Sequence, residues 1–253
     1  MPKPRSADDP ALEGRHRDVI LTMATTVMCP ITVLHAIHFS GVAVRTRQRM
    51  MAVLSQWRLV NRAAVTVRAP HVGRRRALVY LSHEGWQLAG TLGAAVPPLA
   101  MRRLAAAVSD AVAEVADAYA TALTSGLLDA GALWTVCPPP QQEYAPMPEG
   151  VWALLQRDQE VLAFDLDLPG RSLAQVENRL KNWRHFIAAH RQEHQRVAVC
   201  YVATTDRRQQ EIAGLRSQNG WGWLHLDTPV AVLRSQFLSG TPGDSGPCSG
   251  GTG

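Results

Sequence analysis

Apolar residues recur at helical spacing along the first part of the chain. Residues 17–27 form one such segment. A second begins at Pro30, which suits the first turn of a helix, and runs to about Phe39. After a break at Ser40-Gly41, residues 43–57 form a third. Its apolar stripe consists of Val44, Met50, Val53, Leu54 and Trp57.

Two short strand-like runs follow the third helix, at 63–67 and 77–81, and the turn-rich stretch APHVGRRR separates them. Residues 82–88 then open a short helix. Three helices followed by a two-stranded ribbon is the order of a winged helix-turn-helix domain, whose third helix enters the DNA major groove. We therefore expect such a domain over 15–92, after a flexible leader at 1–14.

Strand and helix patterns alternate in the second half of the chain. Short apolar runs predict strands, and an amphipathic segment after Ser172 predicts a helix with this residue as N-cap. The expected order is strands at 151–155 and 161–166, a helix at 172–190, a strand at 197–203, a helix at 207–217 and a strand at 221–226. This α/β domain, over 132–235, resembles a restriction-endonuclease-like core, so the expected fold class is α+β.

An alanine-rich helical pattern fills residues 97–128, between the two expected domains. Small side chains let helices approach closely, so this connecting helix is either a core helix that bridges the domains or the seam of a homodimer. Residues 239–253 are rich in Gly, Ser and Pro, lack core-forming side chains and predict a disordered tail.

Charge is distributed unevenly along the 253 residues, which carry 26 basic and 21 acidic side chains for a net charge of +5. No acidic residue lies between Asp18 and Glu84, whereas nine arginines lie between Arg45 and Arg76. Solvated helix faces usually mix both signs, because like charges at helical spacing repel. The N-terminal region therefore suits a polyanion such as duplex DNA, in preference to a winged helix that contacts only protein.

The polar face of the third helix carries side chains that can recognise bases. Arginine can bridge O6 and N7 of guanine, and glutamine can bridge N6 and N7 of adenine. Hydroxyls and guanidiniums at a helix start commonly hold phosphates, and a basic ribbon turn can reach the backbone or an adjacent minor groove. The candidate base-reading residues are Arg45, Gln48 and Arg49, and the candidate backbone contacts are Thr46, Arg47, Arg74, Arg75 and Arg76.

Several of these segments resemble the replication-relaxation family, proteins of plasmids and mobile elements in Gram-positive bacteria. RTRQRMMAVLSQWRLV and LSHEG (45–60 and 81–85) resemble its winged-helix half. PEG, FDLD and a helix with Lys181 and Trp183 resemble its C-terminal motifs. Arg58 stands where the family usually has glycine, and Asp165 where it usually has glutamate. The resemblance implies a double-stranded DNA-binding protein in replication, relaxation or transfer control, with a replication or transfer protein as a candidate partner.

Carboxylates in the α/β domain suggest a second hypothesis. The protein would be a Mg²⁺-dependent endonuclease or nickase, and its winged helix would target it to DNA. Glu149, Asp165 and Asp167 could hold one ion, since residues 165 and 167 point to the same side of a strand. The lysine usual two residues after the central acid is absent, so Lys181 would have to replace it. We therefore favour a degenerate, non-catalytic core without a cofactor, which serves dimerisation or ligand recognition.

Other metal and membrane patterns are weak. HRQEH at 190–194 fits a zinc-peptidase arrangement but is wholly polar, and His35 and His38 suit helix packing or phosphate contacts better than metal. The four cysteines form no CxxC pair, which argues against a structural zinc site. Residues 19–44 lack formal charges but are too polar for a membrane span, and no signal peptide is visible, so we expect a cytoplasmic protein.

Overall fold

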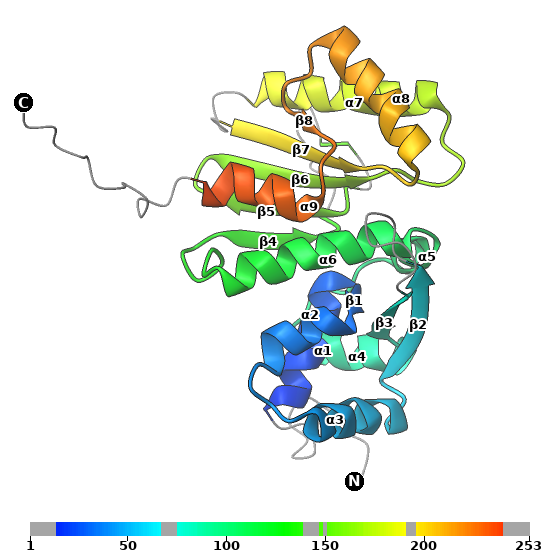
Figure 1. The fold of residues 1–253 in the computed structure, drawn as a ribbon, viewed down its shortest axis with the longest axis vertical. Coiled ribbons are helices and arrows are strands. Elements are labelled where there is room, and N and C mark those ends of the chain that lie inside the picture. Colours follow the sequence, from blue (N-terminus) through cyan, green and yellow to red (C-terminus); the bar gives the residue numbers. More distant parts are fainter. Residues whose placement is uncertain (1–13, 67–74, 139–146, 149–150, 191–195, 240–253) are drawn as a thin grey trace, which may run out of the picture.

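The computed structural model describes residues 14–66, 75–138, 147–148, 151–190 and 196–239. Its fold is mixed α+β, as the sequence predicted, with a three-stranded and a five-stranded sheet. The long helix α6 lies between the N-terminal elements and the five-stranded sheet (Figure 1). Apart from Gly14 and Ser239, the expected leader and tail lie outside the described residues. Within the described part, no helix is long and apolar enough to cross a membrane.

The N-terminal elements follow the order expected from the hydrophobic pattern, with one addition. A short strand, β1, follows α1 and pairs antiparallel with β3, which also pairs with β2, so the sheet order is β1-β3-β2. No strand was expected here, because three residues between two helices give too short a pattern. The bounds are α1 Arg15–Thr26, β1 Met28–Pro30, α2 Ile31–His38, α3 Val44–Gln56, β2 Val60–Thr66, β3 Arg75–Leu81 and α4 His83–Thr91.

Helix α3 is fixed by its inner face and by its C-terminal end. Met51 and Leu54 are buried, whereas Val44, which we expected in the apolar stripe, is exposed because it begins the helix before the core is reached. At the other end, the N–H of Leu59 donates to the carbonyl oxygen of Leu54 at 3.0 Å. Arg58 adopts a left-handed conformation there, with φ 58°. This is a Schellman-type end, in which glycine is the favoured residue.

The expected connecting helix is two helices, α5 (Leu99–Ala107) and α6 (Ser109–Thr124), with a break at Val108. Helix α6 packs on β1 and α2 on one side and on α9 (Pro229–Leu233) and β6 on the other. Its alanines and valines are buried nearly all the way round. Of the two alternatives for this segment, α6 is therefore a core helix, and its faces are not available for a dimer seam.

The C-terminal half is a five-stranded sheet of order β4-β5-β6-β7-β8. The pairs β4–β5 and β5–β6 are antiparallel, whereas β6–β7 and β7–β8 are parallel. Helices α7 and α8 form the crossovers, and Ser172 caps α7 through the capping box with Gln175. β4 and α9 were not expected. The bounds are β4 Leu133–Val136, β5 Ala153–Arg157, β6 Glu160–Leu166, α7 Leu173–Ala189, β7 Arg196–Val202, α8 Asp206–Asn219 and β8 Leu224–His225.

Strand β6 divides its side chains between the two faces of this sheet. Leu162, Phe164 and Leu166 join the core beneath α6 and α9. Ala163 joins the core beneath α7 and α8, and Asp165 points to the same side, where its partners on α7 lie. The sheet is therefore the middle layer between two helical layers, and both aspartates of FDLD belong to the α7–α8 side.

Candidate nucleic-acid interface

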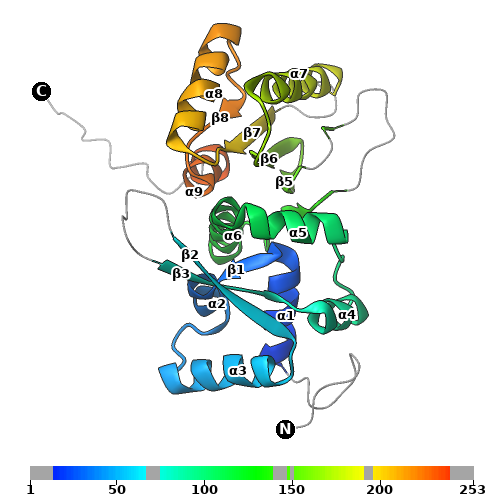
Figure 2. The same ribbon diagram turned by 90° about the vertical axis from the view of Figure 1, so that its right-hand side faces the viewer.

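The outer face of α3 is the candidate interface. Figure 2 shows α3 at the end of the molecule opposite the five-stranded sheet, with no other helix or strand beyond it. Arg45, Gln48 and Arg49 are exposed, as are Ala52 and Gln56 one and two turns later. The structure therefore gathers the three predicted base-reading side chains on one exposed helical face.

No negative charge compensates this face within the described residues. None of their carboxylates lies within ion-pair distance of Arg45 or Arg49, and the same is true of Arg58 and Arg62. Exposed arginines without an internal partner keep all their donors available to a ligand. This arrangement is suited to phosphates and to the acceptor atoms of guanine.

The predicted phosphate contacts at the start of α3 differ from one another. Thr46 is exposed, but Arg47 is half-buried, and its Nε atom is shielded from solvent without a hydrogen-bond partner among the described residues. Arg47 lies near His35 of α2, whose pKa is lowered by burial and further by the charge of Arg47. Arg47 therefore lies on a different side of α3 from Arg45 and Arg49, two residues away along the helix.

Two of the three predicted ribbon contacts lie at the start of β3. Arg75 and Arg76 begin β3, where they pair with Thr66 and Val65, and only their backbone is described. Arg74 lies outside the described residues.

Two exposed arginines were missing from the predicted set. Arg58 follows α3, and its carbonyl oxygen accepts a hydrogen bond from Ser82 Oγ at 2.6 Å. Arg62 lies on β2, where it pairs with Val79 of β3. Their positions in the same acid-free stretch were the available signal. Arg58 and Arg62 were not predicted, because the prediction considered only the polar face of the third helix and the turn of the ribbon.

Asp165, a candidate metal ligand, is fully buried and engaged on both oxygens. Arg179 of α7 donates from Nε to Oδ2 at 2.7 Å and from Nη2 to Oδ1 at 2.8 Å. Trp183 Nε1, one turn later, donates to Oδ2 at 2.8 Å. Burial alone would lower the pKa of Arg179, but the charge of Asp165 and the hydrogen bonds to it outweigh burial and raise it.

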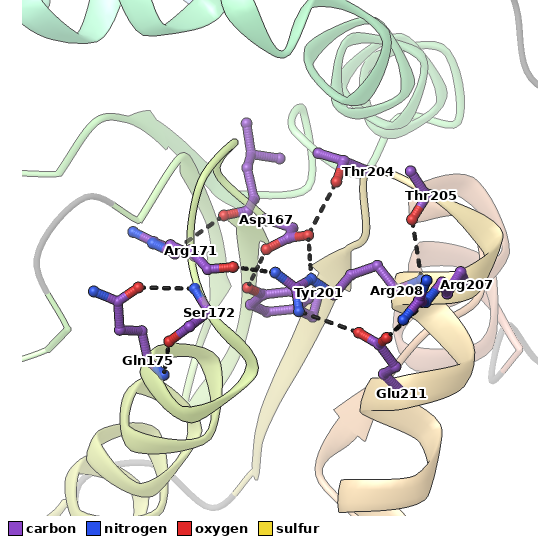
Figure 3. Close-up of polar contacts among 11 residues, drawn as sticks. Asp167, Arg171, Ser172, Gln175, Tyr201, Thr204, Thr205, Arg207, Arg208 and Glu211 are labelled. Atoms are coloured by element: carbon purple, nitrogen blue, oxygen red, sulfur yellow. Dashed lines mark hydrogen bonds and ion pairs between the residues drawn. The ribbon is translucent and has the colours of Figure 1, made fainter.

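Asp167, at the end of β6, is 1% exposed and also fully engaged (Figure 3). Tyr201 Oη donates to Oδ1 at 3.2 Å, and Thr204 Oγ1 and Arg208 Nε donate to Oδ2 at 3.0 and 3.1 Å. Arg208 also donates to the carbonyl oxygen of Arg171, which ties the start of α8 to the loop before α7. Burial, with the negative charges of both aspartates, raises the pKa of Tyr201 well above its usual range.

These carboxylates do not fit a Mg²⁺ site. Each already carries an arginine, and a metal ion would have to displace that cation from a buried position. Lys181 forms an ion pair with Glu177 at 2.8 Å on the exposed side of α7. Glu149 lies outside the described residues, and among those described no group of three or more His, Cys, Asp and Glu side chains could hold a metal.

The histidines of the other metal patterns also have packing partners. His190 ends α7 and is buried, with its ring 4.4 Å from that of Phe186. His194 lies outside the described residues. His38 Nε2 lies 2.8 Å from Thr22 Oγ1, and His35 packs edge-on against Phe39.

Comparisons of the chain with protein-family models, with curated proteins and with solved structures give no significant match. A functional hypothesis must therefore be based on the exposed face of α3 and on the engaged carboxylates beneath α7 and α8.

Proposed function

We propose that the protein binds double-stranded DNA through α3, acting as the recognition helix of a winged helix-turn-helix domain. The observation that carries this proposal is the exposed face of Arg45, Gln48 and Arg49, which has no carboxylate partner in the described residues. A face of this kind has few stable roles without a polyanion, because its like charges repel.

The arrangement of the surrounding elements supports a winged helix. Helices α2 and α3 are joined by the short turn at 39–43, and α3 is followed directly by the antiparallel pair β2–β3. Strand β1 completes the sheet on the other side of β3. In winged helices this order presents the third helix to the major groove and the ribbon to the backbone or the minor groove.

The residues divide into two roles under this proposal. Arg45, Gln48 and Arg49 contact base edges, while Thr46, Arg58 and Arg62 contact phosphates together with the ribbon arginines. Arg47 is left out of both groups, because its side chain is half-buried and its charge acts on His35 of α2.

The engaged aspartates favour a non-catalytic role for the C-terminal half. Asp165 and Asp167 serve buried ion pairs that fix α7 and α8 to the sheet. We place this half in recruitment of a replication or transfer protein, or in pairing with a second copy of the chain. Following the family resemblance, we place the protein in replication, relaxation or transfer control of a plasmid or mobile element.

Selection from a random duplex library tests the proposal directly. The wild-type chain should enrich a short common sequence that contains guanine and adenine. The Arg45→Ala/Arg49→Ala variant should enrich no common sequence, or only a degenerate one. The control variant Arg157→Ala/Arg184→Ala removes the same charge from the C-terminal half and should enrich the same sequence as the wild type. Failure of the wild type to enrich any duplex would refute sequence recognition.

A further inference from the structure

A cavity of about 290 Å³ lies beneath α5, apart from the α3 face. Helix α5 packs on α6 and lies across from β3 and the start of α4 (Figure 2). Tyr80 and Leu81 of β3 and Trp86 of α4 line one side of the cavity, and Leu99 and Ala106 of α5 line the other. Leu99 remains 53% exposed.

The lining of this cavity combines basic side chains with the uncharged polar side chains of Asn61, Tyr80 and Ser82. Arg102 and Arg103 of α5 and His83 of α4 line it, and none of the described acidic residues does. The guanidinium carbon of Arg102 lies 5.3 Å from the ring centroid of Trp86. The Arg102 Nε atom is shielded from solvent and has no hydrogen-bond partner among the described residues. Because no water-sized probe reaches this Nε atom, a ligand in the cavity would meet the two terminal Nη groups of Arg102, whose N–H donors suit an anion.

We infer that this cavity binds a small aromatic anion, such as an aromatic carboxylate or sulfonate. The anionic group accepts hydrogen bonds from Arg102, and the rings pack against Tyr80, Trp86 and Leu99. The volume equals that of about ten water molecules in the liquid, enough for one or two fused rings. Aromatic walls with a few convergent donors are the usual composition of a small-molecule site.

The cavity also borders Ser82, which is hydrogen-bonded to the segment that follows α3. Ser82, which lines it, donates from its N–H to the carbonyl oxygen of Leu59 at 2.9 Å and from Oγ to that of Arg58. A ligand in the cavity would therefore contact the segment that fixes α3 to α4. The binding inference itself does not depend on DNA recognition.

A pair of fluorescent probes tests the inference on the full chain. Anilinonaphthalene sulfonate is the anionic probe, and phenylnaphthylamine has the same rings without the sulfonate. The wild type should bind the sulfonate saturably at one site, at least about tenfold more tightly than the neutral probe, as expected for a charge-assisted hydrogen bond. Arg102→Leu should remove this preference. Ala106→Phe should fill the space and weaken both probes, whereas Ala100→Phe, on the same helix but outside the cavity lining, should weaken neither.

If the wild type bound the sulfonate and the neutral probe with equal affinity, the inference would be overturned by that result alone. Unchanged binding in Ala106→Phe would overturn it too, because the probe would then lie elsewhere. Circular dichroism of each variant shows whether the fold is retained.

Discussion

A methyl group on Gly85 would lie 2.1 Å from the carbonyl oxygen of Leu59. The first turn of α4 thus touches the backbone that follows α3, with no space for a side chain between them. This contact, together with the hydrogen bond from the Ser82 N–H to the same carbonyl, sets the position of α3 relative to the sheet.

Gly85→Ala should therefore destabilise the protein by about 2–3 kcal/mol, because the added methyl forces two backbones apart. Urea denaturation measures the change. Gly214→Ala is the matched control, since Gly214 lies in α8 with open space around its Cβ position. That substitution should stabilise by roughly 0.5–1 kcal/mol, as alanine does in an exposed helix. Equal effects of the two substitutions would mean that the α3–α4 contact is not close.

Arg58→Gly should stabilise the protein by roughly 0.5–1 kcal/mol, because Arg58 holds a left-handed φ of 58° that glycine adopts without strain. The same substitution should weaken DNA binding on all sequences alike, through loss of one phosphate contact. Arg62→Gly, on β2, should instead lose stability, since glycine weakens a strand. Thermal melting of both variants measures these changes in stability. A melting temperature of Arg58→Gly below that of the wild type would contradict the proposed strain at Arg58.

Asp165→Ala should cost about 3–5 kcal/mol of stability, because it removes the carboxylate that balances the buried charge of Arg179. Lys181→Ala, which removes an exposed ion pair with Glu177, should cost less than about 1 kcal/mol. Denaturant midpoints of the two variants give the comparison. A small effect of Asp165→Ala would show that the carboxylate is free of Arg179 in solution and would reopen its candidacy as a metal ligand.

Stability should fall as the pH drops below about 6.5, in part through His38. Burial lowers the pKa of His38, and the charge of Arg15 adds to this, while Asp18 opposes it. A histidine whose pKa is lower in the folded state takes up its proton preferentially when unfolded, so acid favours unfolding. His38→Gln should show a smaller loss of unfolding free energy between pH 8 and pH 5.5 than the wild type. An identical loss would assign the pH dependence to other groups.

The sequence predicted α1–α4, α7 and α8 because amphipathic spacing is local information, whereas it missed α9 and the break between α5 and α6. The polar face of α3 is exposed as expected. β1 and β4 were missed, since a strand of three or four residues is defined by the partner it pairs with and not by its own pattern.

For Asp165 and Asp167, the local sequence pattern predicted the side of the strand but not the residues that they contact. Their spacing correctly placed Asp165 and Asp167 on one side of β6, but their partners Arg179 and Arg208 lie on later helices. Spacing within FDLD cannot reveal those cations. Arg179 and Trp183, one helical turn apart, were the available signal that α7 offers donors to a buried acid.

Fluorescence anisotropy across a salt series tests the central claim, that α3 recognises duplex DNA. With the enriched duplex, the logarithm of the wild-type affinity should fall linearly with that of the salt concentration, by about 0.9 per phosphate contacted. Arg45→Ala/Arg49→Ala should weaken binding at least about tenfold, with Arg157→Ala/Arg184→Ala close to wild type. An absence of wild-type binding at low salt, or equal losses in the two double variants, would contradict the claim.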